Sequence, residues 1–229
     1  MTAKLIESFE LCEEVRHFVF EVPEVETFDF EPGQFVSFNE TFGDRSITRA
    51  YSIASAPNGN RIELCLNRVS EGRFSPLLFD MKPGDSLGMK GPLGYFVLRN
   101  PGRDVLFIAT GTGIAPFRSM LKAHLVQGLK QEYTLLFGVR YEPNLLYREE
   151  FEALARQYPN FRFWPTISRP DEGWTGKRGR VQLHIDEALG NRRDLDIYIC
   201  GMREMVDEVR NNLKLLGFER RQVIIEKYD

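Results

Sequence analysis

The residues with the clearest chemical meaning form a glycine-rich turn in the second half of the chain. Residues 110–116 read Thr-Gly-Thr-Gly-Ile-Ala-Pro, follow an apolar run that ends at Ala109, and precede a helical pattern. Glycine lets the backbone turn tightly, and the free N–H groups at the start of a helix attract phosphate. The turn could bind a pyrophosphate, or it could serve only to pack the strand against the helix. Both interpretations stay open, because Pro116 replaces the third glycine of the usual dinucleotide fingerprint.

Cations gather after the next two predicted strands, at residues 133–139 and 161–167. The first of these strands ends in Arg140. At the same position, an NAD-specific domain usually has a carboxylate that binds the ribose 2′-hydroxyl. Several donors at one place would suit a 2′-phosphate, although each cation alone could be a solvated loop residue. The cations are Arg140, Arg169, Lys177, Arg178 and Arg180, with Ser168 among them.

A second group of candidate residues lies in the first half of the chain. Arg49 and Tyr51 are expected on one side of a strand, with Ser52 facing the other way. An arginine for phosphate and an aromatic plane for stacking suit a flavin nucleotide, but a surface arginine and a core tyrosine would show the same spacing. Residues 71–76 then form a turn that opens a short helix, which is another possible anion site.

Composition excludes several classes of protein. With 42% hydrophobic and 28% charged residues and a net charge of −3, the chain is expected to be folded and soluble and not to bind nucleic acid. No apolar run approaches the roughly 18 residues that span a bilayer, and the N-terminal residues do not resemble a signal peptide, so we expect a cytoplasmic protein. Cys12, Cys65 and Cys200 stand too far apart for a zinc or iron–sulfur site, so no metal is expected.

Short alternating runs of apolar and polar residues position the first group of candidates. Alternation over residues 1–98 predicts antiparallel strands, and a small closed barrel would hide their edges. Pro and Gly clusters predict the turns at residues 31–33, 57–60, 82–85 and 91–94.

The pattern changes after Pro101, which divides the chain into expected domains at residues 1–100 and 101–229. Continuous apolar runs now alternate with helical segments, which predicts a doubly wound parallel sheet. One expected helix covers residues 202–216, with Gly217 as its cap. The expected strands are residues 105–109, 133–139, 161–167, 197–200 and 223–225.

Five motifs in order along the chain resemble the ferredoxin–NADP reductase superfamily, over essentially its whole length. The resemblance implies a six-stranded antiparallel flavin-binding β-barrel followed by a doubly wound parallel-sheet nucleotide-binding domain. The motifs are Arg49-Ala50-Tyr51-Ser52 (RxYS), Gly72 to Ser75 (GxxS), Gly111 to Pro116 (GTGIAP), Cys200-Gly201 (CG) and Glu226-Lys227-Tyr228 (ExY).

The resemblance implies a flavin site in the first domain. Arg49 would pair with the FAD pyrophosphate, Tyr51 would lie against the isoalloxazine ring, and Ser52 would hydrogen-bond flavin N5, the atom that accepts hydride. The other residues implied on the flavin are Ala50, Leu66, Asn67, Arg68, Gly72, Arg73, Phe74 and Ser75.

The resemblance also implies a nicotinamide pocket in the second domain. Cys200 and Glu226 would border it, and Tyr228 would cover the flavin until nicotinamide displaces it. The catalytic residues implied are Ser52, Cys200, Glu226 and Tyr228. The other residues implied on the nucleotide are Gly111, Thr112, Gly113, Ile114, Pro116, Arg140, Ser168, Arg169, Lys177 and Gly201.

Two features depart from the plant-type members of this family. Asp229 follows Tyr228, whereas those enzymes end on the tyrosine. Residues 171–179 are more similar to NADH-using flavin and oxygenase reductases. The choice of nucleotide therefore stays open, and Ser168 with Arg169 favours NADPH.

The function implied is hydride transfer from NAD(P)H to FAD, followed by release of single electrons to a separate ferredoxin or flavodoxin. Basic residues such as Arg45 would help an acidic carrier to dock. One alternative is an NAD(P)H:flavin reductase, in which flavin is a diffusing substrate. Another is an electron-transfer or nucleotide-sensing subunit of a larger, oxygenase-type complex. We expect a monomer.

Overall fold

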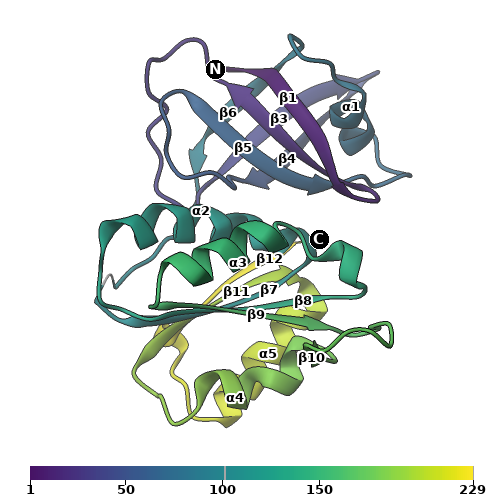
Figure 1. The fold of residues 1–229 in the computed structure, drawn as a ribbon. Coiled ribbons are helices and arrows are strands. Elements are labelled where there is room, and N and C mark those ends of the chain that lie inside the picture. The colour runs from purple at the N-terminus through teal and green to yellow at the C-terminus, as the bar shows by residue number, and fades with distance from the viewer. Residues whose placement is uncertain (101, 229) are drawn as a thin grey trace. The chain divides into compact units, whose positions relative to one another are not determined.

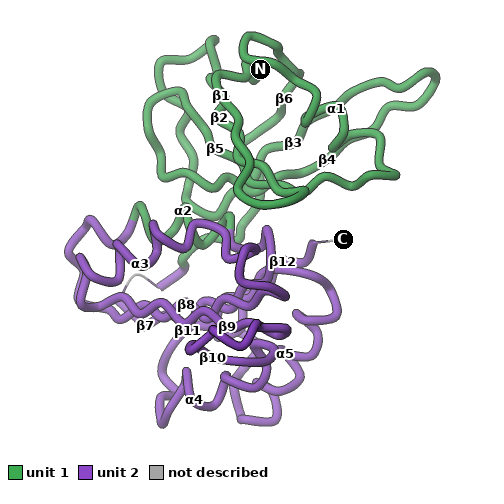
Figure 2. Tube along the Cα trace, turned by 45° about the vertical axis from the view of Figure 1, so that its right-hand side comes forward, with its two compact units in different colours: residues 1–98, 115–123 green, residues 99–114, 124–229 purple. Residues whose placement is uncertain are grey.

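The chain folds into two compact units, which Figure 2 colours separately. The computed structural model describes residues 1–100 and 102–228. The first unit contains Met1–Leu98 and Ala115–Ala123, and the second contains Arg99–Ile114 and His124–Asp229. Pro101, the predicted domain boundary, and Asp229, the residue after the terminal tyrosine, lie outside the described residues.

The first unit is built on a six-stranded antiparallel sheet with the strand order β4-β3-β6-β1-β2-β5 (Figure 1). Beyond β4, Ile53 pairs with Leu64 of β5, and the Ala54 amide donates to the Glu63 carbonyl at 2.7 Å. This pairing joins the two edge strands, so the expected barrel is confirmed. The strands are β1 (Thr2–Cys12), β2 (Val15–Glu21), β3 (Phe35–Phe42), β4 (Arg45–Ser52), β5 (Arg61–Asn67) and β6 (Ser86–Leu93).

Aromatic side chains fill the barrel. Phe18, Phe20 and Phe38 are fully buried, and the Phe20 and Phe38 rings lie 5.5 Å apart between centroids. Helix α1 (Phe74–Asp80) closes the cluster with Phe74, which is also buried. Large rings dominate the burial of apolar surface, so this core is what holds the strands in register.

The turn predicted at residues 91–94 is wrong for its first three residues. Strand β6 continues to Leu93, which pairs with Phe35 of β3, while Lys90 pairs with Ser37. Gly91 and Pro92 therefore both oppose Val36, which makes a β-bulge. Proline has no N–H to donate, and a bulge tolerates it inside a strand because pairing is already interrupted there.

The second unit is a six-stranded parallel sheet with the order β10-β9-β8-β7-β11-β12, which confirms the predicted doubly wound architecture. Helix α3 (Arg148–Gln157) covers one face, and α4 (Ile185–Leu189) and α5 (Arg203–Leu215) cover the other (Figure 1). The strands are β7 (Asp104–Thr110), β8 (Tyr133–Val139), β9 (Phe161–Ile167), β10 (Lys177–Arg178), β11 (Leu195–Met202) and β12 (Val223–Tyr228).

Apolar residues three and four apart attach α5 to the sheet. Met205, Val206, Val209 and Leu213 are buried, and Gly217 follows the helix with a φ of +87°. No helix among residues 1–100 and 102–228 is long and apolar enough to cross a membrane. The remaining short helices are 3₁₀ turns at Gly111–Ile114, Leu125–Gln127, Glu142–Asn144, Val181–His184 and Arg220–Gln222.

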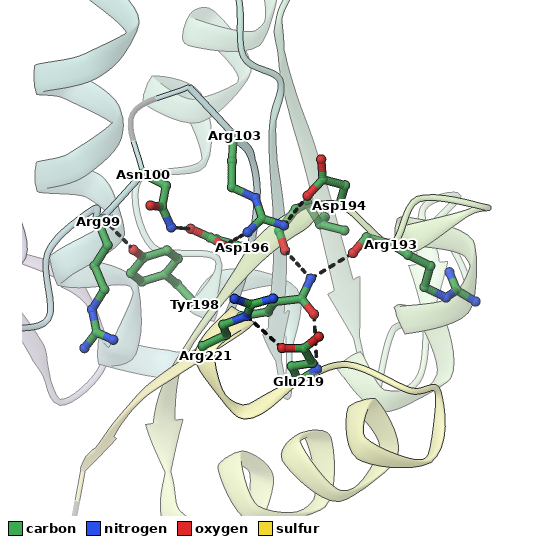
Figure 3. A network of polar contacts seen from close by, with 11 residues as sticks. Arg99, Asn100, Arg103, Arg193, Asp194, Asp196, Tyr198, Glu219 and Arg221 are labelled. Atoms are coloured by element: carbon green, nitrogen blue, oxygen red, sulfur yellow. Dashed lines mark hydrogen bonds and ion pairs between the residues drawn. The ribbon is translucent and has the colours of Figure 1, made fainter.

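A polar network attaches the start of the second unit to β11 (Figure 3). The Arg99 amide donates to the Tyr198 hydroxyl at 3.0 Å, and the Asn100 side-chain amide donates to Asp196 at 2.7 Å. Arg103 pairs with Asp196 at 3.4 Å. Asp196 is 1% exposed, so these partners replace the hydrogen bonds to water that its carboxylate has lost.

We predict that Asp196→Ala destabilises the second unit by about 2–3 kcal/mol, because it removes the buried carboxylate that accepts from the Asn100 amide and pairs with Arg103. Urea unfolding followed by tryptophan fluorescence measures this directly, since both tryptophans, Trp164 and Trp174, lie in that unit. Asp194→Ala is the matched control, because Asp194 also pairs with Arg103 but is 95% exposed. Equal shifts for the two variants would contradict the role of burial.

Candidate active site

The carboxyl ends of β7 and β11 form the centre of the candidate site. From β7 the chain proceeds to β8 on one side, while β11 pairs with the other side of β7. Neighbouring strands whose connections run in opposite directions leave a crevice at their carboxyl ends, and ligands of open α/β sheets bind there. The Gly111–Ile114 turn follows β7, and Cys200 and Gly201 lie near the end of β11.

Glycines allow the turn after β7 to lie directly on the end of β11. A Cβ atom on Gly113 would overlap the carbonyl group of Cys200, and one on Gly201 would overlap the Thr110 hydroxyl. Gly111 has a φ of +54°, and no described atom lies within 4 Å of where its Cβ would stand. The turn therefore lies tight against β11 at Gly113, whereas the space beside Gly111 is open.

The predicted helix after the turn is α2 (Ala115–His124), with Pro116 in its first turn. Proline suits this position because its fixed φ is helical and its missing N–H would have had no helical acceptor. The first backbone N–H groups of a helix that begins in this way can receive an anionic oxygen.

Cys200 has a fully buried thiol beside the last strand. Its Sγ lies 4.0 Å from a carboxylate oxygen of Glu226, and the Tyr228 side chain hydrogen-bonds to it. Burial, together with the negative charge of Glu226, raises the pKa of the Cys200 thiol well above its ordinary value, against the smaller opposite effect of Tyr228. The thiol is therefore a neutral, compact group in the wall of the site.

Strand β12 brings Glu226 and Tyr228 to this thiol. Residues alternate across a strand, so the intervening Lys227 faces the other way, where its ammonium contacts Asp207 of α5 at 2.7 Å. Cys200 pairs with Glu226 in the sheet register. The CG and ExY motifs, distant in sequence, are thus neighbours.

Three of the predicted phosphate-binding residues come together at the ends of β8 and β9. The Arg169 amide donates to the Arg140 carbonyl at 2.9 Å, and the Ser168 amide donates to the Val139 carbonyl at 3.0 Å. Arg140, Ser168 and Arg169 are exposed, and one Arg169 Nη lies 3.4 Å from the Tyr141 hydroxyl. The side chains form an exposed cationic edge.

Lys177 differs from these cations because internal partners already hold it. Its ammonium contacts Glu187 at 2.6 Å and lies 4.3 Å from the centre of the Trp164 ring. Arg178, next along β10, donates to the Trp174 carbonyl at 2.6 Å. Both residues therefore stabilise the fold of the loop after β9.

In the first unit, Tyr51 stands between the core and the exposed Arg49. Its ring lies 5.9 Å from Phe38 and 6.4 Å from Phe74 between centroids. Burial raises the pKa of Tyr51 to about 12, although the positive charge of Arg49 acts in the opposite direction. Tyr51 is thus a neutral phenol, and the next residue, Ser52, is 7% exposed.

The GxxS turn is closed by its own serine. The Val69 amide donates to the Ser75 hydroxyl at 2.8 Å, and the Gly72 amide donates to the Val69 carbonyl at 2.8 Å. Phe74, 3% exposed, inserts its ring beside Tyr51, so the turn is anchored next to β4. Arg73 remains exposed.

The end of β5 supplies the remaining flavin candidates. Leu66 is 3% exposed and belongs to the barrel core, so only its backbone could face a ligand. Asn67 and Arg68 are exposed, and the Arg68 guanidinium lies 5.9 Å from the centre of the Phe79 ring of α1. Ala50 is exposed on β4.

The donors of the first unit fit the chemistry of FAD. Three exposed guanidinium groups belong to β4, to the end of β5 and to the start of α1, and arginine binds diphosphate oxygens in pairs. A neutral aromatic ring and a buried hydroxyl follow each other at the end of β4, which suits a flat ring with polar edge atoms. The guanidinium groups are those of Arg49, Arg68 and Arg73.

Sequence reasoning missed one buried charge. Arg118, on α2, is 6% exposed and forms an ion pair with Glu63 of β5. The signal was an arginine inside the largely apolar segment at residues 114–121. Its partner could not be identified without the fold.

Comparison with known proteins finds two family models in succession along the chain. The family described as "Oxidoreductase FAD-binding domain" matches residues 2–98, and the "Oxidoreductase NAD-binding domain" matches residues 107–211. The chain is 40% identical to "Ferredoxin--NADP reductase B" of Sorangium cellulosum, over 99% of this chain and 97% of that protein.

Two further similarities concern a longer relative and a solved structure. The chain is 34% identical to the "Toluate 1,2-dioxygenase electron transfer component" of Pseudomonas putida, over 87% of this chain but only 59% of that protein. The crystal structure of a ferredoxin NADP+ reductase from Neisseria gonorrhoeae with bound FAD and NADP superimposes with a TM-score of 0.85, at 25% identity, over 99% of this chain and 98% of that one.

We predict that Cys200 resists alkylation in the folded protein. At pH 8 its buried thiol stays protonated, because its pKa is raised, so iodoacetamide should label it more than about tenfold more slowly than the partly exposed Cys12. Peptide mass spectrometry over a time course measures both rates. In urea the two rates should converge, and equal rates in the folded protein would show that Cys200 is accessible.

Proposed function

Because the chain belongs to the ferredoxin–NADP reductase superfamily, we propose that it is an FAD-dependent NAD(P)H reductase that passes electrons singly to a separate ferredoxin or flavodoxin. The FAD domain would comprise residues 1–100, and the NAD(P) domain residues 101–229. The observation that carries the proposal is the contact of Gly113 with Cys200, which sets a phosphate-binding turn against the CG motif.

The first unit would hold FAD through its exposed cations. FAD, when bound, accepts hydride from a reduced nicotinamide and releases its electrons one at a time. Arg49 and Arg73 would bind the diphosphate, Tyr51 would lie against the isoalloxazine ring, and Ser52 would donate a hydrogen bond to N5. Anchoring of Tyr51 by Phe74 supports this assignment, since it orients the ring before a ligand arrives.

The second unit would hold the nucleotide. Backbone N–H groups of the Gly111–Ile114 turn and of the start of α2 would bind the pyrophosphate, and Cys200, Gly201 and Glu226 would border the nicotinamide. The neutral Cys200 thiol suits this role, because it offers an apolar contact and does not compete as a nucleophile. Tyr228 would cover the flavin until nicotinamide takes its place.

The proposed carrier is a separate protein. The relative with 40% identity is named as a ferredoxin–NADP reductase, which supports ferredoxin as the acceptor. Arg45 is exposed on β4 and would offer a basic group to an acidic carrier.

A second candidate is the reductase subunit of an oxygenase. It is favoured by the similarity to the electron transfer component of toluate dioxygenase, of which the chain spans 59%. Such a subunit would reduce its own oxygenase or carrier much faster than an unrelated ferredoxin.

The other alternative is an NAD(P)H:flavin reductase. Such an enzyme would lose its flavin on desalting, because flavin would be a diffusing substrate.

For the nucleotide we propose NADPH. Arg169 and Arg140 are exposed at adjacent strand ends, joined by a backbone hydrogen bond of 2.9 Å, and neither has a carboxylate partner among the described residues. Two such guanidinium groups suit a 2′-phosphate. Lys177 would act indirectly, through the fold of the neighbouring loop, because Glu187 already neutralises it.

We predict that Ser52→Ala retains FAD on desalting but is reduced more slowly than wild type. A hydrogen bond to developing charge contributes about 1.5–3 kcal/mol, which corresponds to roughly 10- to 100-fold in rate. Anaerobic stopped-flow mixing with NADPH measures the limiting rate. Ser46→Ala, an exposed hydroxyl on the same strand, is the control. An unchanged rate in Ser52→Ala would refute the role of Ser52, and a colourless wild type would favour the flavin reductase.

We predict that Arg169→Ala raises the KM for NADPH by roughly 10-fold or more, because a charge-assisted hydrogen bond is lost, and leaves the KM for NADH nearly unchanged. Steady-state ferricyanide reduction with both nucleotides measures the two constants. Arg221→Ala, an exposed arginine before β12, controls for general loss of positive charge. Equal effects of Arg169→Ala on both nucleotides would remove the argument for NADPH.

A further inference from the structure

Helix α2 continues the nucleotide turn, yet its side chains bind the segment that follows Ser52. The Arg118 guanidinium donates to the Ala54 carbonyl at 2.9 Å, and the Ser119 hydroxyl donates to the Ser55 carbonyl at 2.5 Å. Arg118 is 6% exposed and Ser119 is fully buried. Two adjacent residues of the helix therefore hold two adjacent carbonyl groups, within three residues of Ser52.

Glu63 holds the same segment from the opposite side. Its carbonyl accepts from the Ala54 amide at 2.7 Å, and its amide donates to the Ser55 hydroxyl at 3.1 Å. Its carboxylate pairs with the same Arg118 nitrogen that binds Ala54. Arg118, Glu63 and the Ala54–Ser55 backbone thus form one closed polar cluster.

Basic groups surround the Glu63 carboxylate. Besides Arg118, His17 has its Nε2 3.7 Å away, and Lys122 contributes from the next turn of α2. Burial works against ionisation of Glu63, but these charges outweigh it and hold the pKa of the carboxyl below its ordinary value. The ion pair is therefore present at neutral pH.

Stability alone does not require an ion pair at this place. Taking two charges out of water costs free energy, and apolar residues of similar size are often as stabilising as a buried pair. Apolar packing already attaches α2, because the Phe117 ring lies 5.8 Å from the Phe96 ring between centroids and Met120 lies against Gly33. What the directional bonds of Arg118 add is a defined position of the helix along the Ser52 segment.

We propose that Arg118 is a positioning residue for hydride transfer, holding α2, whose first N–H groups would bind the nucleotide, at a fixed place on the segment after Ser52. This rests on the proposed function. Ser119 supports the same placement with its bond to Ser55. The loss of Arg118 should therefore affect the rate of flavin reduction more than nucleotide binding, because the pyrophosphate contacts themselves remain.

The test uses the FAD-loaded Arg118→Gln protein in anaerobic stopped-flow mixing with NADPH. The limiting reduction rate should fall by roughly 10- to 100-fold, with the nucleotide Kd within about threefold of wild type. Arg118→Lys, which keeps the charge and one donor direction, should recover part of the rate. Bound FAD should remain at wild-type content.

Arg192→Gln is the matched control. Arg192 also donates to a backbone carbonyl, that of Ala188 at 2.7 Å, and also lies near carboxylates, those of Asp104 and Glu132 at 3.7 Å. It stands at the amino end of β7, away from the turn after that strand. It should lower thermal stability and leave the reduction rate unchanged.

Each outcome has one meaning. A folded, FAD-loaded Arg118→Gln protein that is reduced within about twofold of the wild-type rate overturns the positioning role. So does a rise in Kd that accounts for the whole loss of efficiency. If Arg118→Gln does not fold, Ser119→Ala removes an uncharged bond of the same cluster, and the same two criteria apply to it. Failure of both NADPH and NADH to reduce the wild type refutes the proposed function instead.

Discussion

The second unit depends on a close approach of two backbones that only glycine permits. Gly113 lies where a Cβ would overlap the Cys200 carbonyl, so the turn after β7 rests on the end of β11 without side chains between them. The parallel register continues this arrangement, since Cys200 pairs with Ala109 on one side and Glu226 on the other. Three motifs that are far apart in sequence therefore meet at one sheet edge, where backbone amides are available to an anion.

In the first unit, aromatic packing brings the motifs together. The Phe74 ring joins the GxxS turn to Tyr51, and Tyr51 in turn rests on Phe38 of the barrel core. The barrel thus orients its exposed cations and its neutral phenol through a rigid core, as a cofactor site requires. The buried Arg118 then connects α2 to the carbonyl groups that follow Ser52. In this arrangement the protein supplies position and polarity, while the chemistry belongs to the cofactor.

Local pattern was enough to predict most elements, because alternation and apolar runs reflect which faces are buried. It was not enough at residues 91–93, where a Gly-Pro pair typical of a turn lies in a β-bulge whose cause is the register of β3. Lys177 could not be separated from the binding cations, since its partner Glu187 lies ten residues further on. Arg118 was missed because Ala54 and Glu63 are 64 and 55 residues away. Contacts of such separation are set by topology, which local sequence does not encode.

The most direct test of the central claim is an anaerobic titration of the desalted protein with NADPH, followed through the visible absorption of the flavin. The account predicts that the protein retains FAD and that about one equivalent of NADPH bleaches it, because hydride carries both electrons. Full oxidation on addition of ferredoxin or flavodoxin would complete the sequence of electron transfer. A protein that binds no FAD, or whose bound FAD stays oxidised with excess NADPH and NADH, would contradict the account.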